Sequence, residues 1–177
     1  LGLDQPLGVQ YIYYLKNFVT GDFGHSFHYG EPVIRIIGNR LPNTIMLFTT
    51  SIILSALVGV FLGKIASWHK GKKTDTWMTL GALATHTVFL PWLALIMIWV
   101  FAYKLGWFPI NGMISEEVWL DPESGIWAKF LDILHHMVLP LATLFLIHFG
   151  SYLLIMRSSM LETLKEDYIL SARPKGL

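Results

Sequence analysis

Cysteine is absent from this chain of 177 residues, and charged residues are scarce. The first absence excludes disulfides, thiolate metal sites and thiol redox chemistry, and it leaves the redox compartment open. Only 14% of the residues are charged, whereas 54% are apolar and the mean hydropathy is +0.52, a balance too apolar for a soluble domain of this length. The net charge of +1 favours neither nucleic acid nor an acidic ligand as a partner. We therefore expect a protein embedded in a lipid bilayer.

Three long segments contain no Asp, Glu, Lys or Arg, namely residues 41–63, 76–103 and 133–156. A helix needs roughly 20 residues to cross about 30 Å of hydrocarbon, and each segment is long enough. We expect membrane spans over residues 44–63, 78–103 and 137–156. Buried helices of a large soluble protein are the weaker alternative, because three such segments occur in one chain. The predicted fold class is an all-α, polytopic helical bundle in the membrane.

Basic residues are distributed unequally between the two sides of these spans. Eight lie in the loop after the first span and in the tail after the third, whereas five are spread over the longer N-terminal stretch and the loop between the second and third spans. Short cytoplasmic loops are enriched in Lys and Arg. The N-terminus is therefore predicted to lie outside and the C-terminus in the cytoplasm, in a multi-pass protein of the cytoplasmic membrane.

Residues 1–43 are predicted to form an extracytoplasmic segment with interfacial helices, ahead of a membrane domain over residues 44–177. A short surface helix should end at the run Thr20-Gly21-Asp22 and at Gly24, since both are breaker signals. A second helix should start after Glu31 and Pro32, lie on the membrane surface and end before Pro42. We assign this second helix no ligand.

Two features of the predicted spans concern packing and bending. Gly59 and Gly63 form a small-xxx-small pair that allows another helix to approach closely. Pro91 frees the carbonyl group one turn earlier and favours a kink, a device tolerated in bundles that line a pathway. Trp92 lies too deep for an interfacial belt, which suggests that it faces the bundle interior. Pro91 and Trp92 are therefore candidate pathway or kink residues, with a simple packing bend as the alternative.

Five of the seven histidines lie in or near the predicted spans and raise the question of a metal site or proton relay. His86 and His148 are solitary on different spans, and the adjacent His135 and His136 point in different directions on a helix, so no metal site is predicted. An intramembrane enzyme that uses these histidines is a weaker hypothesis. The chain also has no GxxxxGK[ST] loop, so it is not expected to bind nucleotide by that route.

The C-terminal tail, RSSMLETLKEDYILSARPKGL, leaves the third span at Arg157. It is polar but keeps apolar residues at three- and four-residue spacing, which is typical of an amphipathic helix, and Gly176 would end that helix. Such a helix is either an anchor on the membrane surface or a plug for the groove of a partner. The residue pattern alone leaves both interpretations open.

Several segments, in order along the chain, resemble the inner-membrane permeases of the dipeptide, oligopeptide and nickel class of ABC importers: LGLDQPL, GDFGHSF, EPVIRIIGNRLPNTI, KLGWFPINGM, VLPLATL and the tail. Only the tail is specific by itself. It is similar to the coupling motif of that family, in which a short helix with an Ala, three intervening residues and a Gly docks into a cleft on the ATP-binding subunit. Ala172 and Gly176 stand at those two positions. Leu170 and Ser171 replace the Glu and Ala of the general motif, and Pro174 introduces a residue that tends to break a helix.

The resemblance implies a type I ABC importer permease in which residues 157–177 form the coupling segment, truncated within the motif. It also implies a second homologous permease, cytoplasmic subunits that use ATP and magnesium, an extracytoplasmic substrate-binding protein and the lipid bilayer as partners. The chain itself would bind no cofactor, metal or nucleic acid and would not be an enzyme. The residues implied at the ATPase interface are Glu166, Tyr168, Ala172, Arg173, Lys175 and Gly176. For Arg173 and Lys175, the positive-inside bias is an equally good explanation.

Peptides are the implied substrate, with nickel or small oligosaccharides as alternatives. An ion-coupled transporter or a channel should carry paired ionisable groups at membrane depth, and the predicted spans contain none. A receptor or scaffold subunit that needs no ATPase is a further alternative, against which the tail argues. The family pattern leads us to expect a span before Leu1 and further spans after Leu177.

Overall fold

The computed structural model describes residues 5–166, and over that range it contains helices and no strand. α2 and α6 are each long and apolar enough to cross a membrane, and the bent pair formed by α3 with α4 and η1 is a third candidate span. The predicted all-α fold of about three spans is thus confirmed. The elements are α1 (Leu7–Val19), α2 (Val33–Trp68), α3 (Lys73–Thr87), α4 (Leu90–Met97), the π-helix η1 (Ile98–Lys104), α5 (Glu116–Leu120) and α6 (Ile126–Thr163).

The chain divides into two compact units, Leu1–Met46 and Leu47–Leu177. In the first unit, α1 ends at Val19, and Gly21 then takes a positive φ of 82°, a conformation that glycine adopts without steric cost. The predicted short helix and its end near Thr20 are therefore confirmed, and its place on a surface stays a prediction. An isolated β-bridge between His25 and Pro32 closes the following loop directly before α2 begins.

α2 differs from the prediction, because the expected interfacial helix and the first span form one continuous helix of 36 residues. Pro42 lies inside this helix and does not end it. A proline removes one backbone donor, the one that would bond to the carbonyl one turn earlier, and membrane helices tolerate such a loss. The boundary expected at residue 43 is therefore absent from the secondary structure.

The predicted second span is also different, because it is broken rather than gently kinked. α3 and the α4–η1 helix meet at an angle of 97°. The break falls at Val88 and Phe89, whose backbones are extended, and Pro91 lies in the first turn of α4, where its fixed φ favours a helix start. At the end of α3, the Thr87 hydroxyl donates to the carbonyls of Leu83 and Ala84, which satisfies backbone acceptors near the break.

α6 contains the predicted third span and extends beyond it at both ends. It has 38 residues, and Pro140 lies inside it. At 1.5 Å per residue, a helix of this length measures about 57 Å, well above the roughly 30 Å of a bilayer core. The charge-free segment therefore marks only the middle part of a longer helix, the part that fits within the hydrocarbon core.

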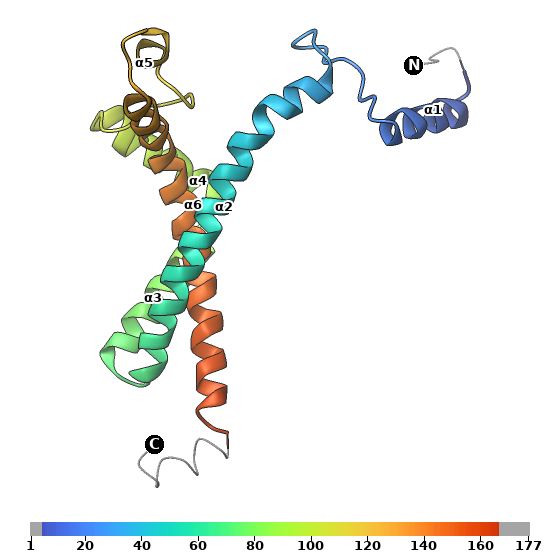
Figure 1. Cartoon of the computed structure of the whole chain (residues 1–177). Helices are drawn as coiled ribbons and strands as arrows, with labels where there is room; N and C mark the ends of the chain where they lie inside the picture. The colour runs from blue at the N-terminus through green and yellow to red at the C-terminus, as the bar shows by residue number, and fades with distance from the viewer. Residues whose placement is uncertain (1–4, 167–177) are drawn as a thin grey trace. The chain divides into compact units, whose positions relative to one another are not determined.

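The second unit is organised around α6, which α3, α4 and α5 all contact. In Figure 1, the second half of α2 also crosses α6, and the crossing lies at Gly59 and Gly63. A Cβ atom added to Gly59 would lie 2.6 Å from Tyr152 Cβ, and one added to Gly63 would lie 2.7 Å from the Leu153 carbonyl oxygen. The predicted close approach of a second helix at this glycine pair is therefore confirmed.

The same face of α2 carries small buried residues along its length, Ser51, Ser55, Gly59 and Gly63, at four-residue spacing. The Ser55 hydroxyl donates to the Phe145 carbonyl of α6 at 3.5 Å. In contrast, most large apolar side chains of the described helices are exposed, including those of Leu57 and Phe61 on α2. This pattern fits helices that are held together by small residues and surrounded by lipid or further helices.

Candidate functional site

The structure describes only part of the predicted coupling site. Glu166 is exposed in the bend after α6, whereas Tyr168, Ala172, Arg173, Lys175 and Gly176 lie outside the described residues. Pro91 lies in the first turn of α4, directly after the break of the second span, so the helix is disturbed where the kink was predicted. A role of Pro91 in a transport pathway stays a prediction. Trp92 is 59% exposed, so within the described chain it does not face a closed interior.

An ion pair between Asp75 of α3 and Arg157 of α6 lies at the end of α6 from which the tail departs, and sequence reasoning did not single it out. Arg157 binds with two groups: Nε donates to Oδ1 of Asp75, and Nη2 donates to Oδ2 at 2.9 Å. The side chains of Arg157 and Asp75 are 26% and 6% exposed. Two parallel bonds between a guanidinium and a carboxylate make a pair that is strong and specific in geometry.

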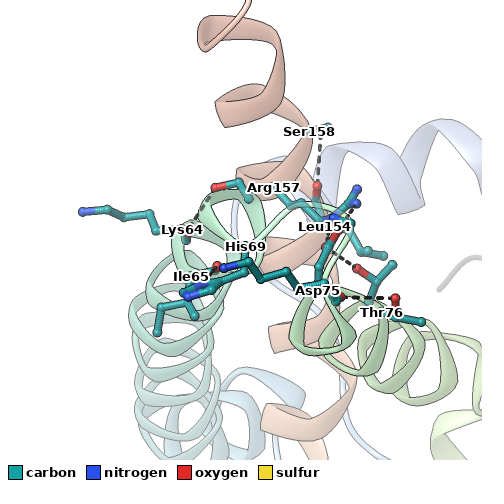
Figure 2. Close-up of polar contacts among 12 residues, drawn as sticks. Lys64, Ile65, His69, Asp75, Thr76, Leu154, Arg157 and Ser158 are labelled. Carbon is teal, nitrogen blue, oxygen red and sulfur yellow. Dashed lines mark hydrogen bonds and ion pairs between the residues drawn. The ribbon is translucent and has the colours of Figure 1, made fainter. Parts of the chain in front are cut away.

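The same carboxylate also holds the loop between α2 and α3. Gly71, whose φ is 77°, donates its backbone N–H to Asp75 Oδ2 at 3.1 Å, and the Thr79 hydroxyl donates to Oδ1 at 3.4 Å. Figure 2 shows Asp75 in the first turn of α3 and the Arg157 side chain that reaches toward it from α6. Asp75 therefore joins three parts of the chain: the loop, the first turns of α3 and the C-terminal turns of α6 around Arg157, which we call the base of α6.

Two further contacts fix the end of α2 next to this pair. The ring nitrogen Nδ1 of His69 lies 2.9 Å from the Ile65 carbonyl oxygen, and the Ser67 hydroxyl donates to the Lys64 carbonyl at 2.8 Å. The lysines in this loop and in the adjoining helix turns, in contrast, are exposed: Lys64, Lys70, Lys72 and Lys73. The loop thus combines a buried, paired carboxylate with a basic surface.

The register between α3 and α6 explains why Asp75 meets Arg157. A Cβ added to Gly150 would lie 2.5 Å from the Ala82 carbonyl oxygen, so α3 and α6 touch backbone to backbone at that level. Asp75 lies seven residues before Ala82 on α3, and Arg157 lies seven residues after Gly150 on α6. Seven residues make about two helical turns, so in an antiparallel pair these side chains return to the same interface.

Polar contacts also join the other end of α6 to the loop between η1 and α5. Asp132 Oδ2 accepts the Ser115 backbone N–H at 2.8 Å and the Trp119 indole N–H at 3.1 Å. His135 Nε2 lies 2.8 Å from the Trp107 carbonyl oxygen. Nδ1 of His136 lies 2.9 Å from the Asp132 carbonyl oxygen of the preceding turn. These histidines are therefore partners in structural hydrogen bonds.

A cavity of about 360 Å³ lies next to this loop, within the second unit. Its wall is largely apolar, and the side chains of Asn111, His136 and Thr143 are its polar members. α4, the helix after the break, contributes Leu90 and Ala94 to the wall. The cavity thus adjoins the bent span and α6, but its apolar wall offers no catalytic or ion-binding constellation.

No group of three or more His, Asp or Glu side chains within residues 5–166 is placed to hold a metal ion. His86, the histidine nearest the break, instead has Nδ1 2.9 Å from the Ser151 hydroxyl oxygen on α6. The described arrangement therefore joins α3 to α6 by polar contacts, and it presents a basic loop beside the end of α6 that carries Arg157.

Known proteins match the chain over nearly its whole length. The family model described as binding-protein-dependent transport system inner membrane component matches residues 55–177. The chain is 36% identical over 176 residues to the oligopeptide transport system permease protein AppB of Bacillus subtilis (strain 168), an alignment that covers 99% of this chain and 53% of that protein. It is 32% identical over 187 residues to the di/tripeptide transport system permease protein DppB of Pseudomonas aeruginosa (strain UCBPP-PA14), covering 100% of this chain and 56% of that protein. The chain therefore spans about half the length of these curated relatives.

Proposed function

The chain belongs to the family of binding-protein-dependent transport system inner membrane components, and from that premise we propose that it is a permease subunit of an ATP-driven importer that carries peptides across the cytoplasmic membrane. The observation that carries the proposal is the family match over residues 55–177, which includes the whole tail after α6. Relatives named as peptide permeases favour peptides over nickel or oligosaccharides as the substrate.

In this proposal the loop between α2 and α3 and the base of α6 face the cytoplasm of a bacterium or archaeon. The distribution of basic residues supports this orientation, because Lys70 and Lys72 lie in that loop and Lys64 and Lys73 lie in the adjoining turns of α2 and α3. The loop and the base of α6 lie at the same end of the bundle, since Asp75 contacts Arg157. The predicted coupling segment, residues 157–177, begins in the last turns of α6 and would therefore meet cytoplasmic partners.

The chain supplies half of the transport pathway, and other subunits supply the rest. A second, homologous permease completes the pathway, cytoplasmic subunits hydrolyse ATP with magnesium, and an extracytoplasmic binding protein delivers the peptide. The residues proposed at the ATPase interface are Glu166, Tyr168, Ala172, Arg173, Lys175 and Gly176. Closure of the ATPase pair would move the tail, and α6 would transmit that movement into the bundle.

Co-purification from native membranes tests this proposal. An ATP-hydrolysing subunit should accompany the full-length protein, and Gly176→Trp should remove it, because a large side chain at this position would prevent close backbone approach to the cleft. Gly8→Trp is the matched control: no atom lies within 4 Å of a Cβ added at Gly8 in α1, so that variant should retain the ATPase.

Two results would count against the proposal. If no ATPase accompanies even the unaltered protein, the transporter assignment fails and a scaffold role takes its place. If the ATPase remains bound equally to both tryptophan variants, the tail is not the docking segment.

A further inference from the structure

The Asp75–Arg157 pair lies where a force on the tail would enter the bundle. Beyond Leu153, no α6 residue up to Thr163 is buried, so the last turns of α6 project from the described part of the bundle. Arg157 lies six residues before Thr163, where α6 ends, a rise of about 9 Å along the helix. The pair therefore fixes α6 close to the point at which the bundle stops supporting it.

α3 contacts α6 at three places along its own length. The ion pair of Asp75 lies at the first turn, Ala82 packs against Gly150 in the middle, and His86, near the break, contacts the neighbouring Ser151. α3 thus connects the base of α6 with the 97° bend of the second span. Leu90, just after that bend, lines the apolar cavity.

We propose that Asp75 and Arg157 are positioning residues of the transport cycle, which make the α2–α3 loop and α3 move with the base of α6. A displacement of the tail then reaches the broken span and the cavity wall instead of bending the unsupported end of α6. This inference rests on the proposed function, because it requires a tail that ATP-driven partners displace. It assigns no catalytic role to either residue, since both act through the helices that they join.

A bidentate ion pair suits this positioning role better than an apolar contact between the same helices would. A bidentate contact restrains orientation as well as distance, whereas an apolar contact of similar size permits sliding. The carboxylate also accepts from Gly71, so the loop backbone is tied to the same point. Loss of both charges should therefore loosen the connection without leaving a buried charge unpaired.

The test uses the complete transporter in proteoliposomes and measures peptide uptake for each ATP hydrolysed, normalised to the amount of assembled complex. The double variant Asp75→Asn with Arg157→Gln should assemble in near-normal amounts, hydrolyse ATP and show uptake per ATP reduced about tenfold, a typical size for energetic coupling between sites. Lys73→Gln, an exposed change in the same turn of α3, is the control and should behave as the unaltered protein.

The outcomes separate this inference from the proposed function. Normal uptake per ATP in the double variant, or a loss that only follows the amount of assembled complex, overturns the positioning role while peptide import stands. If the unaltered protein shows no ATP-driven uptake, the proposed function is refuted and the transport role of the pair falls with it.

Discussion

Substitution of Gly59 by leucine is expected to destabilise the protein strongly, because α2 and α6 would be forced apart at their crossing. Even a Cβ atom at this position would lie 2.6 Å from Tyr152 Cβ and 2.7 Å from the Phe149 carbonyl oxygen. The obstacle is partly backbone, which cannot rotate away as a long side chain can. Such overpacking costs about 3 kcal/mol of unfolding free energy or more.

Thermal unfolding of the purified protein in detergent measures this effect. Gly81→Leu is the matched control, because Gly81 also lies within a helix and no described atom lies within 4 Å of a Cβ built there. The leucine at Gly59 should lower the unfolding midpoint far more than the leucine at Gly81. Equal midpoints for the two variants would show that the observed α2–α6 crossing does not exist in the membrane protein.

Removal of one member of the ion pair is the second large effect. Asp75→Asn or Arg157→Gln alone should lower the free energy of unfolding by about 2 kcal/mol, since each leaves a largely buried group without its charged partner. The expected loss is smaller than that for a fully buried pair because the Arg157 side chain is 26% exposed. The double variant should lose less than the sum of the two single variants.

A double-mutant cycle of unfolding midpoints in detergent measures the interaction of the pair. Thr76→Ala provides a control in the same turn of α3, since the exposed Thr76 hydroxyl bonds only to the Lys72 carbonyl of its own helix among the contacts described. Losses that simply add in the double variant would mean that Asp75 and Arg157 do not interact in the folded protein.

Much of the fold follows from the distribution of charge along the chain. The segments without charged residues lie within the helices that cross or enter the membrane, because an ionised side chain is costly in hydrocarbon. The same signal cannot locate helix ends, since a helix continues into the interface as long as its backbone bonds are satisfied. Pro42 is an example: the proline predicted an end, but α2 passes through it.

The break in the second span was only partly predictable. Pro91 indicated a disturbance, yet the 97° angle depends on how α3 and α4 each pack against α6. Packing partners that are distant in the sequence fix such angles, and a local pattern of residues does not contain them. The exposure of Trp92 has the same origin, because which side of α4 is covered depends on neighbouring helices.

The candidate site was predicted from resemblance in the tail, whereas its nearest described contact was not predicted. Asp75 and Arg157 are 82 positions apart, and no short motif links them. Their pairing depends on the antiparallel register set by Gly150 and Ala82. A usable signal does exist: one acid and one base border charge-free segments at the same predicted side of the membrane, which makes them candidates for an interfacial pair.

Accessibility of the α2–α3 loop tests the central claim, that this loop and the base of α6 face the cytoplasm, where ATP-driven partners can act. Single cysteines can be introduced at exposed Lys70 and Glu117, with any cysteine outside these 177 residues replaced by serine, and labelled in intact cells with a membrane-impermeant maleimide. We predict that Glu117→Cys is labelled from outside and that Lys70→Cys is labelled only after the membrane is permeabilised. Labelling of Lys70→Cys from outside, with Glu117→Cys protected, would contradict the account, because the tail after α6 would then lie on the side without ATP.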